Sequence, residues 1–274
     1  MTVTTSVRAV IFDLGNTLWF EARRPNEDDI WRREAEAVRP LLTEWGISLD
    51  VRLEDLLRDI WNAYELAFTH ERARGAYRDP SLPVLIQAGL AEHGATVTGD
   101  QAVAWWRASW IHAHHFGMQL YPDTLDVLRA LKDQGLRIGL NTDRPCTADM
   151  LERDLPHFGL ADFVDAAVCS GDTGFVKPHP SSFELAVTKL SIPAVATVMV
   201  GDSCERDCAG AKALGMTTVL KLNGLHDANP CPHADHTIHD LNELLTLPIF
   251  ASPTGHPIRA ESPTPHEDQN ANRY

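Results

Sequence analysis

Apolar positions recur along this chain with two different spacings. Between Phe20 and Gln119 they recur at three- and four-residue steps, and no strand pattern is evident there, which predicts helices. From Tyr121 onward, short apolar runs alternate with helical patterns, as is typical of βαβ units and a parallel sheet. The apolar run Val7–Phe12 belongs with this second set. We therefore predict an α/β fold, in which a Rossmann-like parallel sheet core carries an inserted all-helical domain.

The predicted domain boundaries follow this change in the spacing of apolar residues. The core takes residues 1–18 and 120–250, the helical insertion takes residues 19–119, and residues 251–274 are too polar and proline-rich to fold. Within the insertion, helical patterns cover residues 25–42, 53–68, 84–92 and 100–116. The core is expected to place helices at 123–134, 147–157, 181–190, 207–214 and 240–247, and strands at 136–140, 163–169, 197–200 and 217–222.

The net charge of −14 narrows the range of partners. Nucleic acid and anionic membranes would repel the chain before any specific contact formed, so we expect neither as a partner. No apolar run reaches transmembrane length, and the N-terminal residues lack the basic and apolar regions of a signal peptide. We therefore expect a cytoplasmic protein.

The five cysteines are odd in number and show no CxxC spacing. This pattern predicts neither structural disulfides nor a thiolate zinc site. We expect Cys204 and Cys208 to be small, half-buried fillers. The stretch Cys231–His239 combines one cysteine with three histidines, but a proline-broken segment of this kind is more often only a loop than a metal site.

Polar residues follow several of the predicted strands directly. They are Asp13 after the first strand, Asn141 and Thr142 after another, and Asp202 and Asp207 after a third, with Lys177 in a loop. Because parallel strands bring their carboxyl ends to one edge of the sheet, we expect these side chains to meet there. Carboxylates without a histidine cluster suit Mg²⁺, and a lysine beside them can hold a phosphate. The sequence therefore predicts a site for phosphoryl transfer, with Asp13 as the nucleophile.

Four segments, in this order and spacing, resemble the motifs of the haloacid dehalogenase-like (HAD) hydrolase superfamily. They are Asp13–Thr17, Asn141-Thr142, Lys177-Pro178 and Gly201–Asp207. The last is the most specific, because its Gly-Asp-Ser is followed by Asp207 and then by Ala-Gly-Ala. The helical insertion after the first motif resembles the C1 cap of this superfamily. The resemblance covers about residues 5–248.

The resemblance implies roles for the motif residues. Asp13 would attack the substrate and form a covalent aspartyl intermediate. Mg²⁺ would be held by the side chains of Asp13 and Asp202 and by the main-chain carbonyl of Gly15. Asp207 would act as a further acid, directly, through water or on Lys177.

Two departures from the family pattern affect the chemistry. Phosphatases of the superfamily usually carry a second aspartate as general acid and base two residues after the nucleophile, where this chain has Gly15. The loss predicts a slow enzyme, an activated leaving group or a substitute from the cap, with Glu21, His70, His112, His114 and His115 as candidates. The second departure is Asn141, which would occupy the Ser/Thr position of the second motif and donate to a phosphate oxygen.

Two other reactions of the superfamily are disfavoured by the sequence. Its dehalogenases work without metal and tend to lack the acidic pair of the last motif, whereas Asp202 and Asp207 are both present here. Its enzymes for carbon–phosphorus bonds use a cap lysine to form an imine, and residues 20–119 contain no lysine.

The most consistent interpretation is a Mg²⁺-dependent phosphatase, a monomer or homodimer, that acts on a small phosphorylated metabolite. Substrate contacts are expected from Trp19, Phe20 and Glu21, which follow the nucleophile, and from Thr142 and Arg144 after the second motif. Two alternatives stay open. One is a weak or inactive homologue that binds a phosphorylated ligand or a protein, and the other is a metal-independent 2-haloacid dehalogenase.

Overall fold

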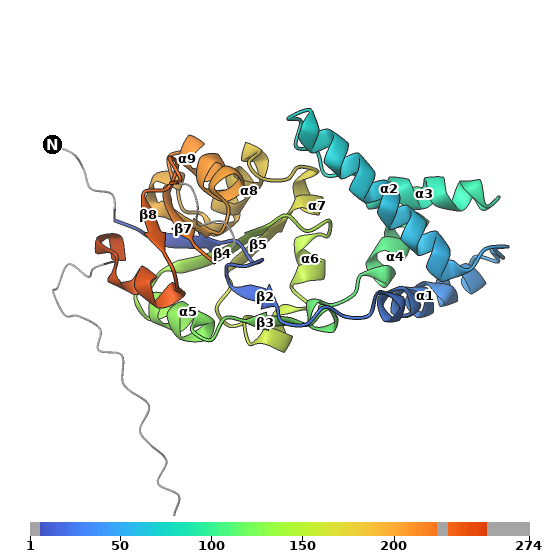
Figure 1. Cartoon of the computed structure of the whole chain (residues 1–274), viewed down its shortest axis with the longest axis horizontal. Helices are drawn as coiled ribbons and strands as arrows, with labels where there is room; N and C mark the ends of the chain where they lie inside the picture. The colour runs from blue at the N-terminus through green and yellow to red at the C-terminus, as the bar shows by residue number, and fades with distance from the viewer. Residues whose placement is uncertain (1–5, 224–229, 251–274) are drawn as a thin grey trace, which may run out of the picture.

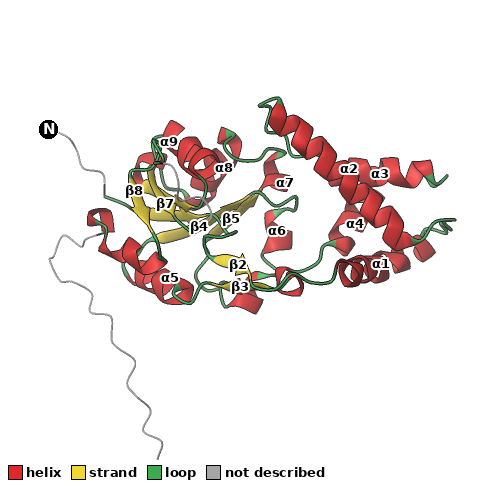
Figure 2. Ribbon diagram, in the orientation of Figure 1, coloured by secondary structure: helices red, strands yellow, loops and turns green. Residues whose placement is uncertain are grey.

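The computed structural model describes residues 6–223 and 230–250 of the chain. Its centre is a six-stranded parallel sheet in the order β5-β4-β1-β6-β7-β8. The strands are β1 (Ala9–Phe12), β4 (Arg137–Thr142), β5 (Ala166–Cys169), β6 (Thr197–Gly201), β7 (Thr217–Lys221) and β8 (His236–Ile238). Figure 2 shows the sheet between two layers of helices. The predicted α/β fold class is confirmed.

Strand β1 lies inside the sheet and is buried on both faces. Phe12 packs into one apolar cluster and Ile11 into another, as the alternation of side chains along a strand requires. In the register of the sheet, Phe12 lies beside Leu140 of β4 and Val200 of β6. The carboxyl ends of three strands therefore meet next to Asp13.

Helices cover both faces of this sheet (Figure 1). The cluster that contains Phe12 takes residues from α5 (Thr124–Asp133), α6 (Ala148–Leu151) and the 3-10 helices η2 (Leu155–Phe158), η5 (Leu241–Thr246) and η6 (Pro248–Phe250). The cluster that contains Ile11 takes residues from α8 (Pro180–Leu190), η3 (Ala194–Ala196) and α9 (Gly210–Ala213). The short helix α7 (Ser170–Thr173) and the π-helix η4 (Cys204–Ala209) follow β5 and β6.

The helical insertion builds an apolar cluster of its own. Its helices are α1 (Glu27–Glu44), α2 (Leu53–Ala73), α3 (Leu82–Glu92) and α4 (Gly99–Ser109), followed by η1 (Ala113–Phe116). Asn26 caps α1 by accepting a hydrogen bond from Asp28 N at 3.0 Å, and Thr98 begins α4 with a capping box. Figure 1 shows these helices gathered at one end of the molecule, beside the sheet.

The prediction that residues 20–119 contain no strand is wrong. Two short strands, β2 (Trp19–Glu21) and β3 (Met118–Leu120), form an antiparallel pair at the two ends of the insertion. Each is three residues long, so neither gives a readable alternation. They are specified by their pairing across the insertion, in which Trp19 lies beside Leu120.

Several other elements differ from the predicted pattern. The helix expected at 207–214 is divided between η4 and α9, and the helix expected at 240–247 is the 3-10 helix η5. Strand β8 lies inside the stretch interpreted as a loop. Within the described ranges, no helix is long and apolar enough to span a membrane. The predicted tail, residues 251–274, lies outside the described residues.

The expectation that the chain has no disulfide is also wrong. Cys204, at the start of η4, is joined to Cys231, which precedes β8, across 27 residues of sequence. The two cysteines meet because β6, β7 and β8 are neighbours in the sheet. Cys146, Cys169 and Cys208 are free and buried, so only Cys208 of the predicted pair is a core filler.

Candidate active site

Asp13 stands at the carboxyl end of β1. Its backbone N–H donates to the carbonyl of Val200 at 2.9 Å, which extends the pairing with β6 by one residue. The chain then turns sharply at Asn16, whose φ of 56° is tolerated better by asparagine than by most residues. The Thr17 hydroxyl donates to Asp13 Oδ2 at 3.4 Å. This turn holds the Asp13 carboxylate at the sheet edge, with 7% of the residue exposed.

Lys177 is the buried cation of this edge. Its ammonium group donates to Asp13 Oδ1 at 2.7 Å, to Asp207 Oδ1 at 2.6 Å and to the carbonyl of Asn141 at 3.0 Å. An ammonium group has three N–H donors, so all three are used. The backbone N–H of Lys177 donates to Asp143 Oδ1 at 2.9 Å, which anchors the loop to the end of β4.

Asp202 and Asp207 follow β6. A Cβ atom at Gly201 would lie 2.3 Å from Asp207 Cγ, so glycine is required where this carboxylate folds back over the strand end. Asp207 Oδ2 accepts from the backbone N–H of Ser203 at 3.0 Å. Because both Asp207 oxygens are engaged, this residue orders Lys177 and the loop after β6.

Three carboxylates at this edge fit a divalent cation. Asp13, Asp202 and Asp207 are all buried, and they offer ligand atoms that lie within 4.8 Å of one another. Asp202 Oδ1 is buried and accepts no hydrogen bond, although Arg206 Nη2 lies 3.7 Å from it, while its Oδ2 accepts from Asn16 and Asn223, each at 3.3 Å. A buried, unsatisfied carboxylate oxygen costs free energy unless it coordinates a cation, and Mg²⁺ and Ca²⁺ prefer oxygen ligands.

The electrostatics reflect the crowding of these acids. Burial raises the pKa of Asp13 to about 7, while the ammonium group of Lys177 acts in the opposite direction. Burial also raises the pKa of Asp202, and the charge of Asp207 adds to this. Burial lowers the pKa of Lys177, but the carboxylates of Asp13 and Asp207 reverse that effect, so its net pKa is raised and it stays charged. A bound cation would favour the ionised carboxylates.

The structure gives Asn141 a different partner from the one that the resemblance implies. Its side-chain amide donates to Ser182 Oγ in α8 at 3.2 Å, and the residue is fully buried. Asn141 joins the site through its main-chain carbonyl, which accepts a hydrogen bond from Lys177 at 3.0 Å. Since successive strand residues face opposite sides, Thr142 is the residue at the end of β4 whose hydroxyl faces away from α8.

The remaining predicted substrate residues lie on β2 and directly after β4. Trp19 is 2% exposed and packs on Phe158, with 5.1 Å between the ring centroids. Phe20 packs on Tyr121 at 4.9 Å, and Glu21 is exposed at the end of β2. The guanidinium of Arg144 lies 5.4 Å from the ring centroid of Trp19, so it covers the residue that follows the nucleophile turn.

Sequence reasoning missed two cations at this edge. Arg206 lies between Asp143, at 3.8 Å, and Asp202, at 3.7 Å. Lys221 ends β7 and donates to the carbonyl of Asn16 at 3.3 Å, and burial lowers its pKa. The reasoning about strand ends that identified Asp13 also applies to Lys221, and Arg206 lies within the last motif.

Gly15 is exposed beside the nucleophile, and a Cβ atom there would meet no heavy atom within 4 Å. The site therefore has room for an aspartate side chain at position 15. Among the candidate substitutes, the His112 ring lies 2.7 Å from Asp154, and the His114 ring packs on His157 at 4.1 Å. Both rings lie in the linker after α4, and their partners belong to η2 or to the residue that precedes it.

Comparison with known proteins agrees with this geometry. The family model described as haloacid dehalogenase-like hydrolase matches residues 7–215. The chain is 36% identical to ribulose-1,5-bisphosphate 5-phosphatase of Halopiger xanaduensis over 56% of this chain and 66% of that protein, slightly less than two thirds. It is 28% identical to glyceraldehyde 3-phosphate phosphatase of Methanocaldococcus jannaschii over 88% of this chain and 96% of that one.

Two solved structures are similar to this chain in both sequence and fold. A HAD phosphatase from Thermococcus onnurineus is 25% identical, with a TM-score of 0.50 over 88% of this chain and 97% of that one. A 2-haloacid dehalogenase from Pseudomonas syringae pv. Tomato DC3000 is 26% identical, with a TM-score of 0.54 over the same shares. The family match spans most of the chain and includes the Asp13, Lys177 and Asp202 segments. The chain therefore belongs to the haloacid dehalogenase-like hydrolase family.

Proposed function

We propose that this hydrolase is a Mg²⁺-dependent phosphomonoesterase that acts through an aspartyl-phosphate intermediate on Asp13. The observation that carries the proposal is the convergence of Asp13, Asp202 and Asp207 at one edge of the sheet, where the buried Lys177 joins Asp13 to Asp207. These acids can hold Mg²⁺, and the metal together with Lys177 would compensate the charge of a dianionic phosphoryl group.

Each residue of the site has a defined task in this proposal. Asp13 Oδ2 attacks phosphorus, while Lys177 holds Oδ1 and offsets the charge of the incoming phosphoryl group. The Thr142 hydroxyl donates to a phosphoryl oxygen, while Asn141 fixes Lys177 through its carbonyl. Asp207 is a positioning residue, because both of its oxygens hold parts of the protein.

Mg²⁺ would be held by Asp13, Asp202 and the main-chain carbonyl of Gly15. When bound, it supplies charge neutralisation that lets an anionic nucleophile approach an anionic phosphate. The unsatisfied Oδ1 of Asp202 supports this assignment. Water enters in the second half of the reaction and breaks the aspartyl-phosphate bond, which returns the Asp13 carboxylate and inorganic phosphate.

Gly15 limits the leaving groups that the enzyme handles well. With no acid two residues after the nucleophile, an alkoxide must leave without a proton from that position. General acid assistance is typically worth about a hundred- to ten-thousand-fold in rate. We therefore propose that aryl and acyl phosphates react faster than alkyl phosphates. The relatives named as sugar- and triose-phosphate phosphatases support a small phosphorylated metabolite as the natural substrate.

The test is phosphate release from acyl, aryl and sugar phosphates, with Mg²⁺ and with a chelator, by wild type and Asp13→Asn. We expect release that needs Mg²⁺ and is lost in the variant. Equal background rates for both proteins on every substrate would overturn the proposal and leave a homologue that only binds its ligand.

A 2-haloacid dehalogenase is the second candidate, favoured by the absence of an acid at Gly15 and by the similarity to the Pseudomonas dehalogenase. It predicts halide release from 2-chloropropionate that a chelator does not affect and that Asp202→Ala tolerates. The buried acidic cluster opposes it, since a metal-free reaction has no use for three adjacent carboxylates.

A further inference from the structure

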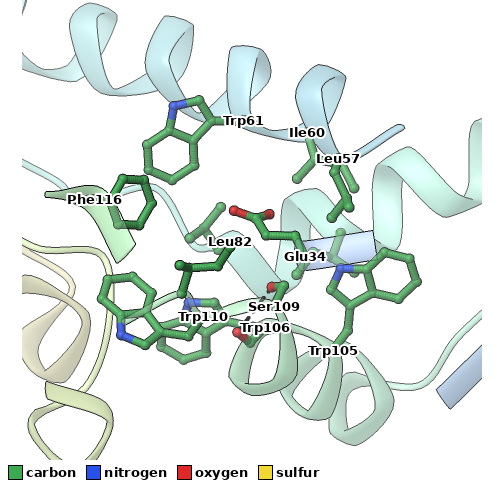
Figure 3. A pocket seen from close by; sticks show the side chains of 12 residues that line it. Glu34, Leu57, Ile60, Trp61, Leu82, Trp105, Trp106, Ser109, Trp110 and Phe116 are labelled. Carbon is green, nitrogen blue, oxygen red and sulfur yellow. Dashed lines mark hydrogen bonds between the residues drawn. The ribbon is translucent and has the colours of Figure 1, made fainter. Parts of the chain in front are cut away.

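The helical insertion contains a cavity that the proposed reaction does not use. Helices α1 to α4 line it mainly with apolar residues, among them Leu57, Ile60 and Leu82. It measures about 70 Å³, several times the roughly 10–15 Å³ that one water needs by the same measure. Figure 3 shows its side chains converging from the four helices. The cavity therefore has room for a small organic ligand.

This cavity is separate from the catalytic edge. Within the described ranges, no residue of that edge lines it, and every lining residue belongs to the insertion. The guanidinium of Arg144 lies between the two places, 5.1 Å from the ring centroid of Trp110 in the cavity wall and 5.4 Å from that of Trp19 beside the nucleophile turn. A ligand in the cavity would therefore be held by the insertion alone.

One carboxylate enters this apolar space. Glu34 lies on the same face of α1 as Ile30 and Val38, which are buried in the insertion. In Figure 3 its carboxylate points into the space between the rings of Trp61 and Trp110. Among the described residues, no other charged side chain lines the cavity, and burial alone raises the pKa of the Glu34 carboxyl to about 8. An acid in such surroundings lacks a positive partner, which a ligand can supply.

Aromatic rings form much of the cavity wall. Trp61, Trp105, Trp106, Trp110 and Phe116 all contribute to it. The faces of such rings attract cations, and a desolvated ammonium group gains most from them. A carboxylate surrounded by tryptophan rings combines the two features that recognise a quaternary or alkylated ammonium group.

A ligand can reach this space from solvent. Glu34, Trp61, Trp110 and Phe116 are half-buried, so part of each side chain contacts solvent while the rest lines the cavity. The apolar residues on the far side, Leu57, Ile60 and Leu82, are buried. The charged and aromatic groups therefore lie where a cation would enter.

We infer that this cavity is a second ligand site, which binds a small organic cation with an alkylated ammonium group independently of the catalytic edge. Glu34 supplies the opposite charge, and the rings of Trp61 and Trp110 contact the alkyl shell of the cation. The inference does not rest on the proposed phosphatase activity, because it concerns binding and not a reaction.

The experiment is a calorimetric titration with choline and with 3,3-dimethylbutan-1-ol, which has the same shape without the charge. We expect wild type to bind choline roughly tenfold more tightly or more. Glu34→Gln should remove this preference. The control Glu44→Gln, at an exposed position of the same helix, should keep it. Equal affinities for the two compounds, a preference that survives in Glu34→Gln, or no choline binding by wild type would overturn the inference.

A second pair of variants tests the aromatic wall. Trp61→Leu should weaken choline binding by roughly fivefold or more, because it removes one ring from the cavity. Trp45→Leu is the matched control, since Trp45 is also half-buried in the insertion but does not line the cavity. Equal losses of affinity in the two variants would contradict a role of the cavity rings.

The carboxylates of the catalytic edge are the other place where a cation could bind. The titrations are therefore repeated with Asp13→Asn, which should bind choline as tightly as wild type does, because Asp13 does not line the cavity. Choline binding that is lost in Asp13→Asn and kept in Glu34→Gln would place the cation at the catalytic edge and overturn the inference. Failure of the phosphatase proposal would leave all of these binding results unchanged.

Discussion

The ammonium group of Lys177 lies 2.7 Å from Asp13 Oδ1 and joins two positions 164 residues apart in the sequence. Asp207 approaches the same nitrogen at 2.6 Å, so one buried lysine separates two buried carboxylates. Taking charges out of water is costly, and the arrangement is stable only while the partners stay together. Lys177 therefore contributes to the folding of the catalytic edge as well as to the proposed chemistry.

Replacing this lysine should cost both stability and activity. In Lys177→Met the two carboxylates face each other without a counter-charge, and we expect the free energy of unfolding to fall by about 3–5 kcal/mol. Urea unfolding measures the loss, and phosphate release should fall to background. Lys212→Met is the matched control, because its pair with Asp235 is partly exposed and should contribute about 1 kcal/mol or less. Equal losses in the two variants would contradict the role of Lys177.

Gly15→Asp should raise turnover. The position has space for a side chain, and its φ lies outside the left-handed region, so aspartate fits without backbone strain. We expect kcat on alkyl phosphates to rise by about tenfold to a hundredfold, with a smaller gain on aryl phosphates, because only a poor leaving group needs a proton. Gly15→Asn has nearly the same shape and no acid. A similar gain in Gly15→Asn would show that general acid catalysis is not the cause.

Mg²⁺ should stabilise the folded protein through Asp202. A ligand that binds only the folded state, at a hundred times its Kd, adds about 2.7 kcal/mol to the free energy of unfolding. We expect Mg²⁺ to raise the melting temperature of wild type and to leave that of Asp202→Asn unchanged. Asp126→Asn, at an exposed ion pair on α5, should respond as wild type does. A full response in Asp202→Asn would place the metal elsewhere.

The disulfide can be tested in solution by counting free thiols. Under denaturing, non-reducing conditions, we expect three reactive thiols, from Cys146, Cys169 and Cys208, and five after reduction. Cys231→Ser should lower the free energy of unfolding by about 3 kcal/mol, because a closed loop restricts the unfolded chain. Reduced wild type should behave as the variant does. Five thiols before reduction would contradict the Cys204–Cys231 pairing.

The position of the acidic cluster could be predicted because it follows from topology. Asp13 and Asp202 each end a strand that the apolar pattern reveals, and parallel pairing of β1 with β6 brings those ends together. The Asn141 amide was predicted to donate to a phosphate oxygen, whereas in the structure it donates to Ser182, and alternation along β4 carries a signal for this orientation. Ile138 and Leu140 share one face, which sends Asn141 toward α8 and Thr142 toward the opposite side.

Other features could not be predicted because they depend on contacts distant in sequence. Cys204 and Cys231 are separated by 27 residues and meet only after three strands have paired. Trp19 pairs with Leu120 across the whole insertion. Glu34 is an intermediate case, since its spacing of four residues from Ile30 and Val38 places it on the apolar face of α1. A single acid in an apolar face is a signal that the sequence contained and that our interpretation passed over.

Glu34 should make the free energy of unfolding depend on pH, and a comparison of wild type with Glu34→Gln should reveal this dependence. Burial raises the pKa of its carboxyl from 4.5 to about 8, so the folded state binds the proton more tightly than the unfolded state. Wild type therefore loses stability as the pH rises from about 4.5 to about 8, whereas neutral glutamine adds no such dependence.

We expect Glu34→Gln to be more stable than wild type above pH 8, by roughly 2–4 kcal/mol, and this difference should shrink as the pH falls from about 8 to about 4.5. Urea unfolding at a series of pH values measures this. Glu44→Gln, on the exposed side of α1, should show no such trend relative to wild type. A difference between Glu34→Gln and wild type that stays constant from pH 4 to pH 9 would mean that the Glu34 carboxylate is already ionised and solvated in the cavity.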